Sequence, residues 1–156
     1  MRGKIVLLAM CLGAADAQAV DYRWTQGFAQ GTVEAIIENA RGSNLNIYCP
    51  SGQEDHTPGM FVTGTGLNPP VGERVTAQVI VDGKNYAFDL DEQQFKAGSR
   101  LGLQDFQALV SALAASRARS FTIEFPKYGL VETFSLAGAA KALGKGKTSI
   151  LKGCVP

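Results

Sequence analysis

Residues 75–90 read VTAQVIVDGKNYAFDL and carry the clearest structural signal of the chain. An apolar residue recurs at every second position on each side of Asp82-Gly83, which is the period of a strand with one buried face. These residues are Val75, Ala77, Val79 and Val81 before the turn and Tyr86, Phe88 and Leu90 after it. Asp-Gly is a preferred two-residue hairpin turn. The stretch therefore predicts an antiparallel β-hairpin.

Two further hairpins are predicted around this one by the same alternation. They comprise residues 32–38 with 45–49, and residues 121–125 with 131–136. The first pair surrounds turn residues at Arg41–Asn44 and directs Cys49 toward the core. The second pair surrounds the turn Pro126–Gly129.

Helical spacing replaces strand spacing in the third quarter of the chain. Leu103, Phe106, Val110 and Leu113 recur at helix intervals and predict a helix over residues 103–115. A short helix over residues 137–143 and a last strand at Thr148–Leu151 complete the expected elements. Residues 51–72 are rich in proline and glycine and predict a long surface loop, with a short strand at Phe61–Thr63 inside it.

This order of elements predicts an α+β fold that is mainly antiparallel β, with hairpins forming a sheet or a small sandwich closed by the helices. The 156 residues fit one domain. Fifteen basic residues against 14 acidic ones give a formal charge of +1, so no overall field attracts nucleic acid or an anionic membrane. His56 is the single histidine, which excludes a site with two histidine ligands.

The N-terminus has the pattern of a secretory signal peptide over residues 1–19. Arg2 and Lys4 precede an apolar run over residues 5–15, and Ala17-Gln18-Ala19 provides small residues for cleavage before Val20. The alternatives are a membrane anchor, for which the run is too short, and lipidation at Cys11, which would shorten the apolar region. We therefore expect a periplasmic or secreted protein without a transmembrane span, and one domain over residues 20–156.

Cleavage changes the composition of the chain. The mature protein has 137 residues, with 13 basic residues against 13 acidic ones, and retains two cysteines, Cys49 and Cys154. An even pair in an exported protein predicts a disulfide. The bridge would close a loop of about 105 residues, for which the chain-entropy estimate is roughly 4–5 kcal/mol. A free nucleophilic thiol or a redox pair is the alternative, but the chain has no C-x-x-C motif.

We expect no cofactor and no metal, because the local motifs for them are incomplete. Gly146-Lys147-Thr148 imitates the end of a phosphate-binding loop, but Lys141 stands where that motif requires glycine. Glu54, Asp55 and His56 group two carboxylates with the histidine, which is too few ligands for structural zinc. A solvated polar loop explains these three residues.

Acidic residues gather near the hairpin of residues 75–90 and offer a catalytic alternative. Asp82, Asp89, Asp91 and Glu92 lie along this stretch, and Asp89 and Asp91 would share one face of a strand. Two carboxylates at such a distance resemble a glycosidase pair. The chain has one tryptophan, Trp24, and no evident aromatic platform for a sugar.

The C-terminal half has a sequence pattern that resembles a known family. The hairpin with Asp82-Gly83-Lys84, the helix near residues 103–115, the strand 121–125, the segment FSLAGAAKAL at 134–143 and the terminal Cys154 are the matching features. Together they resemble small exported bacterial proteins of the invasion-associated locus B type and related periplasmic proteins of unknown function. The resemblance implies a β-rich exported scaffold with a non-catalytic role.

These features favour a non-catalytic protein of the bacterial periplasm or surface that acts by protein–protein contact. It would inhibit another protein, support an envelope or secretion assembly, or interact with a host. Recognition tends to lie in loops on a rigid scaffold, so the candidate binding residues are Tyr48, His56, Met60, Phe61 and Tyr128. The alternatives are an exported hydrolase using Asp89 and Asp91, and a carrier of a small ligand or lipid in a cavity between sheet and helix.

Overall fold

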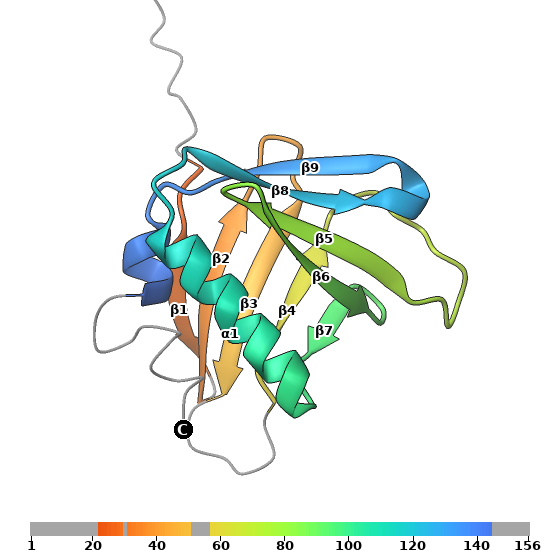
Figure 1. Ribbon diagram of the computed structural model, residues 1–156, viewed down its shortest axis with the longest axis horizontal. Helices are drawn as coiled ribbons and strands as arrows, with labels where there is room; N and C mark the ends of the chain where they lie inside the picture. The colour runs from red at the N-terminus through yellow and green to blue at the C-terminus, as the bar shows by residue number, and fades with distance from the viewer. Residues whose placement is uncertain (1–21, 30, 51–56, 145–156) are drawn as a thin grey trace, which may run out of the picture.

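The computed structural model describes residues 22–29, 31–50 and 57–144, which form two antiparallel sheets (Figure 1). The first sheet has the strand order β1-β2-β3-β4-β7, and the second has the order β6-β5-β8-β9. The first consists of β1 (Thr25–Ala29), β2 (Thr32–Glu38), β3 (Asn44–Pro50), β4 (Gly59–Thr63) and β7 (Gln94–Lys96). The second consists of β5 (Val75–Val81), β6 (Lys84–Leu90), β8 (Ser120–Phe125) and β9 (Leu130–Ser135). The predicted α+β fold, mainly antiparallel β, is confirmed.

All three predicted hairpins are present. The central one turns at Asp82 and Gly83, whose φ angles of 50° and 77° suit a tight two-residue hairpin turn. The short strand expected within residues 51–72 is β4, and it begins two residues earlier than predicted. Two strands were not predicted from the sequence. Strand β1 contains a glycine and is largely exposed, and β7 is only three residues long.

The helices differ in their limits from those predicted. The main helix α1 (Arg100–Ala115) begins three residues early, because the Ser99 side chain accepts a 3.0 Å hydrogen bond from the Gly102 amide and caps it. Its first turn exposes Leu101, so the apolar period starts only later. The short helix is η2 (Ala140–Gly144), a π-helical turn, instead of residues 137–143. Gly138, with φ of 83°, interrupts helical backbone before it. A 3₁₀ turn, η1 (Pro126–Tyr128), joins β8 to β9.

One hydrophobic core joins both sheets and α1. Figure 1 shows α1 crossing in front of β2, β3 and β4, with β5, β8 and β9 above it. The helix contributes four side chains that are at most 1% exposed: Phe106, Leu109, Val110 and Leu113. Alternate residues of the strands face the same core, as the burial pattern of β3 and β5 shows. Packed side chains therefore fill the space between helix and sheets.

Several predictions fall on residues outside the described ranges. They concern the signal peptide at 1–19, His56, the strand at Thr148–Leu151 and Cys154. Within the described ranges, no helix combines the length and the apolar character needed to cross a membrane.

Candidate functional site

A groove of about 810 Å³ opens where the two sheets part. Strands β6 and β7 form a hairpin, in which Asp91 and Gln94 exchange two backbone hydrogen bonds of 2.8 Å. Beyond this bridge, β6 pairs with β5 of one sheet and β7 pairs with β4 of the other. The groove lies beside the diverging strands and is closed on another side by Gly102 and Asp105 of α1. Its volume is within the range of ligand pockets, about 300–1,000 Å³.

The turn at the end of this groove has an unusual backbone. Glu92 and Gln93 occupy its two central positions with φ angles of 46° and 70°. The type I′ hairpin turn needs positive φ at both central positions, and glycine, asparagine or aspartate usually supplies it. Other residues there cost about 1 kcal/mol or more each. Backbone strain of this kind tends to cluster at functional sites, so the turn is a candidate functional segment.

Aromatic rings form the floor of the groove. Phe88 and Phe95 meet edge to face with ring centroids 4.7 Å apart, and Phe95 also contacts Phe106 of α1 at 6.3 Å. Phe88 is 3% exposed, whereas Phe95 is only partly buried. Phe95 therefore provides the accessible apolar surface of the floor, and buried Phe88 and Phe106 hold its ring in place.

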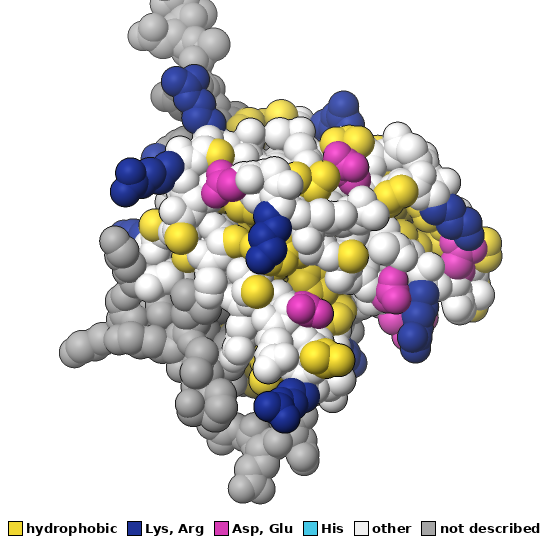
Figure 2. All heavy atoms as spheres, viewed as in Figure 1, with side chains coloured by type: hydrophobic (Ala, Val, Ile, Leu, Met, Phe, Trp, Pro, Cys, Tyr) yellow, Lys and Arg dark blue, Asp and Glu magenta, His cyan; other side chains and the backbone are white. Residues whose placement is uncertain are grey.

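Charged side chains form the rim of the groove and are predominantly acidic. The carboxylates of Asp89, Asp91, Glu92 and Asp105 outnumber the cations of Arg74 and Lys96 by two. Figure 2 shows acidic side chains on this face both over α1 and near the β6–β7 turn, with apolar atoms between them. We call this feature, defined by these six charged residues and the phenylalanine floor, the acidic groove.

The acidic groove does not have the geometry of a metal site. Among the described residues, no three His, Cys, Asp or Glu side chains gather closely enough to hold a metal ion. One oxygen of Asp89 already accepts a 2.8 Å hydrogen bond from the Thr76 hydroxyl. The arrangement suits attraction of a cationic group spread over several contacts better than coordination of one ion.

An aromatic pair continues the surface beside the groove. Tyr48 of β3 and Phe61 of β4 have ring centroids 5.2 Å apart on the outer face of the first sheet. The Tyr48 hydroxyl accepts a 2.7 Å hydrogen bond from the Gln94 side chain. Burial raises the pKa of Tyr48, and this hydrogen bond offsets part of the effect. Because Phe61 and Gln94 also line the acidic groove, pair and groove form one continuous surface.

The residues predicted for binding occupy different places. Tyr48 and Phe61 come together as described, but Met60 points to the opposite face of β4 and is fully buried in the core. Tyr128 lies in η1 and donates a hydrogen bond to Glu73, whose carboxylate also pairs with Lys127 at 2.7 Å. Tyr128 thus attaches the end of the loop before β5 to η1.

The predicted cysteine and carboxylate sites are also separated. Cys49 is fully buried in β3, and its predicted partner Cys154 lies outside the described residues. Asp89 and Asp91 both line the groove, whereas Asp82 stands at the far end of the β5–β6 hairpin and accepts a 2.9 Å hydrogen bond from Ser116. No local sequence pattern indicated the contributions of Arg74, Phe95 and Asp105, because only the fold brings them to β6.

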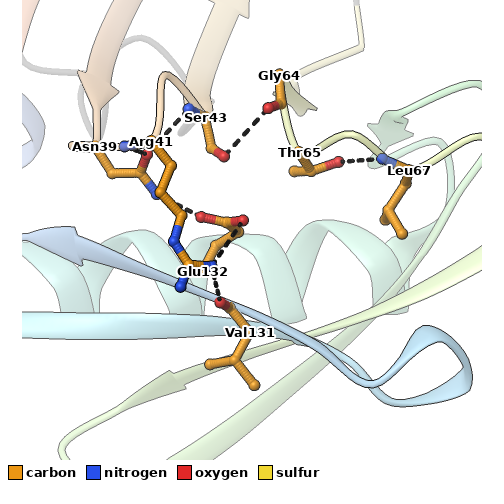
Figure 3. Close-up of polar contacts among 8 residues, drawn as sticks. All are labelled: Asn39, Arg41, Ser43, Gly64, Thr65, Leu67, Val131 and Glu132. Carbon is orange, nitrogen blue, oxygen red and sulfur yellow. Dashed lines mark hydrogen bonds and ion pairs between the residues drawn. The ribbon is translucent and has the colours of Figure 1, made fainter.

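A second polar cluster lies at the β2–β3 turn (Figure 3). The Asn39 side-chain oxygen accepts hydrogen bonds from the amides of Arg41 and Ser43 at 2.9 and 3.0 Å. The Arg41 guanidinium lies 3.7 Å from the carboxylate of Glu132 and donates to the Val131 carbonyl at 3.3 Å. These contacts satisfy one another within the fold, so the cluster has a structural role.

Comparison with known proteins gives a match at the level of a family. A family model described as YfjT matches residues 22–143. No curated protein and no solved structure matches the chain. The matched range contains both sheets, α1 and the entire acidic groove.

Proposed function

The chain belongs to the YfjT family, and from this premise we propose that it is an exported protein that acts by binding another protein. The acidic groove is the observation that carries the proposal. It combines an apolar aromatic floor with a charged rim, and partly buried aromatic residues with charges around them are typical of interfaces. Strands and a capped helix hold its walls, so its shape exists before a partner arrives.

Export is part of the proposal and rests on the N-terminal sequence. Residues 1–19 have the signal-peptide pattern, and the resemblance to the invasion-associated locus B type points to the same compartment. The protein would then work in the periplasm or outside the cell, as an inhibitor, as part of an envelope or secretion assembly, or toward a host. Cell fractionation followed by N-terminal sequencing should find a chain that starts at Val20.

A hydrolase that uses Asp89 and Asp91 is the second candidate, because both carboxylates line the same groove. Both residues are exposed to solvent, whereas the acid of a glycosidase pair sits in a desolvated pocket. Turnover of a panel of chromogenic glycosides, abolished by replacing both residues with asparagine, would favour this candidate over a binding protein. A carrier has less support, since side chains fill the space between α1 and the sheets.

The test of the binding function is retention of a partner from the envelope. The mature protein is immobilised beside a groove variant, D91K/D105K, and a control variant, E38K/E124K, which carries the same change of charge outside the groove. We expect a protein that the wild type and the control retain and the groove variant loses. That protein, once purified, should bind with the same order of affinities. Equal retention by all three, or none by any, would contradict the proposal.

A further inference from the structure

We propose that the partner enters the acidic groove as an extended, basic segment that adds as a strand to the open edge of β6. This inference rests on the proposed function and specifies the chemistry of the partner.

Strand β6 is the terminal strand of its sheet, and among the described residues one of its edges has no neighbouring strand. The two-residue turn makes Val81 and Lys84 a hydrogen-bonded pair, and such pairs alternate with non-bonded ones along an antiparallel ladder. Counting along β6, the backbone groups of Tyr86 and Phe88 face β5. Those of Asn85, Ala87 and Asp89 therefore face away from it.

The outward backbone groups open toward the groove. Ala87 and Asp89 both line it, and β7 does not cover them because it pairs with β4 after the Asp91–Gln94 bridge. No other described strand pairs with this edge. An exposed edge of this kind is a template for adding a strand from another chain, with main-chain hydrogen bonds supplying affinity.

The acidic residues along this edge favour an added strand with basic side chains. Asp89, Asp91 and Glu92 follow one another at the end of β6, and Asp105 faces them from α1. Side chains of a strand alternate between two faces, about 6.6–6.8 Å apart on each. A segment with lysine or arginine at alternate positions would bring cations past these carboxylates while its backbone pairs with Ala87 and Asp89.

An eight-residue peptide of alternating lysine and threonine tests the proposal with the mature protein. Strand addition predicts saturable binding that a glutamate–threonine peptide lacks. Methylating the backbone nitrogens of either all lysines or all threonines blocks one edge of the peptide. We expect one of these two series to weaken binding about tenfold or more and the other to leave it nearly unchanged, because only one edge pairs with β6.

Substitutions at Ala87 test the same contact from the protein side. A87P removes the outward N–H at an edge position where proline is tolerated, and A87V keeps it. We expect A87P to weaken peptide binding about fivefold or more relative to A87V, with both variants folded by circular dichroism. If A87P fails to fold, the methylated peptides on the wild-type protein decide the matter.

The outcomes separate this inference from the proposed function. Equal effects of the two methylation series, or no peptide binding at all, would overturn strand addition. If the envelope partner were still lost specifically from D91K/D105K, the proposed function would stand while this inference fails. Loss of specific retention from the envelope would instead contradict the function itself.

Discussion

The side-chain amide of Asn39 donates a 2.7 Å hydrogen bond to the carboxylate of Glu132, and this buried contact joins the two sheets. Asn39 follows β2 in the first sheet, whereas Glu132 belongs to β9 in the second. The same asparagine accepts the amide hydrogens that shape the β2–β3 turn. One side chain therefore both forms a turn and attaches it to the opposite sheet.

Replacing Asn39 with alanine should lower the free energy of unfolding by about 2–4 kcal/mol, because it leaves a buried carboxylate and two turn amides without their partner. Urea denaturation measures the change. R41A is the matched control, since the Arg41 side chain is 69% exposed and pairs with the same carboxylate at 3.7 Å. We expect its effect to stay below about 1 kcal/mol. Equal effects of the two variants would contradict the role assigned to Asn39.

The contact of Glu73 with Lys127 and Tyr128 predicts a pH dependence of stability. The hydrogen bonds from Lys127 and Tyr128 lower the pKa of Glu73 below its ordinary value of 4.5. The contribution of Glu73 is therefore present above pH 4.5 and is lost as the pH falls through the folded pKa. The difference in unfolding free energy between wild type and E73Q should shrink in that acid range. E38Q, which removes the same charge at another exposed glutamate, is the control for the change of charge alone.

The alkaline limit of the same contact has the opposite sign. The hydrogen bond to Glu73 raises the pKa of Tyr128 above 10.0, so the stabilising contribution is present below pH 10 and is lost as the pH rises through the folded pKa. Because the pKa values of both Tyr48 and Tyr128 are raised, ultraviolet difference titration should show one fewer late-titrating tyrosine in E73Q than in the wild type. An unchanged titration curve would argue against the contact in solution.

The ring of Tyr48 reaches across β4 because Gly59 leaves room for it. A Cβ atom at position 59 would lie 2.6 Å from the Tyr48 hydroxyl oxygen and 2.1 Å from the Phe95 carbonyl oxygen. G59A should therefore destabilise the protein by about 1–3 kcal/mol and displace Tyr48 from Gln94. Exposure of the ring should also bring the pKa of Tyr48 back toward its ordinary value.

Gly27 of β1 provides the control for that substitution. A Cβ atom there would meet nothing within 4 Å, so G27A should leave the unfolding free energy unchanged or raise it slightly. Equal losses in the two variants would mean that a general effect of glycine replacement in strands, and not the crowding at Tyr48, explains the result.

The elements that the sequence predicts well are those that bury one face. The hairpin of β5 and β6 has both the alternating period and the Asp82-Gly83 turn, and both signals agree with its structure. Strand β1 was not predicted because an exposed edge strand shows no alternation of apolar and polar residues. Strand β7 was not predicted because three residues are too few to show a period. Glu132 lies at a core position of β9, so its place in the alternation was predictable, but its partner Asn39 was not.

The residues of the acidic groove also divide into those that the sequence indicates and those that only the fold brings there. Asp89 and Asp91 stand out in the sequence because they lie close together in it, and the groove contains both. Asp105 and Phe95 reach the groove only through the packing of α1 and the divergence of β6 from β7. No local pattern can indicate such an approach, because it depends on which sheet each strand of a hairpin joins.

We expect a disulfide bond between Cys49 and Cys154. The Cys49 side chain is fully buried, and a bridge to the C-terminal segment would close most of the mature chain into one loop. Mass spectrometry under non-reducing conditions should find the protein two hydrogens lighter than after reduction. Removing the bridge by C154A should lower the free energy of unfolding by roughly 4–5 kcal/mol on the chain-entropy estimate.

C154A is the informative variant, since replacing buried Cys49 would also remove core packing. The control is the wild-type protein unfolded in the presence of a reductant, which should match C154A. If alkylation of the unfolded, unreduced protein labelled two thiols, the cysteines would be free and the bridge would not exist. If instead C154A and wild type unfolded at the same denaturant concentration, the bridge would form without stabilising the domain, and the loop-closure argument would be wrong.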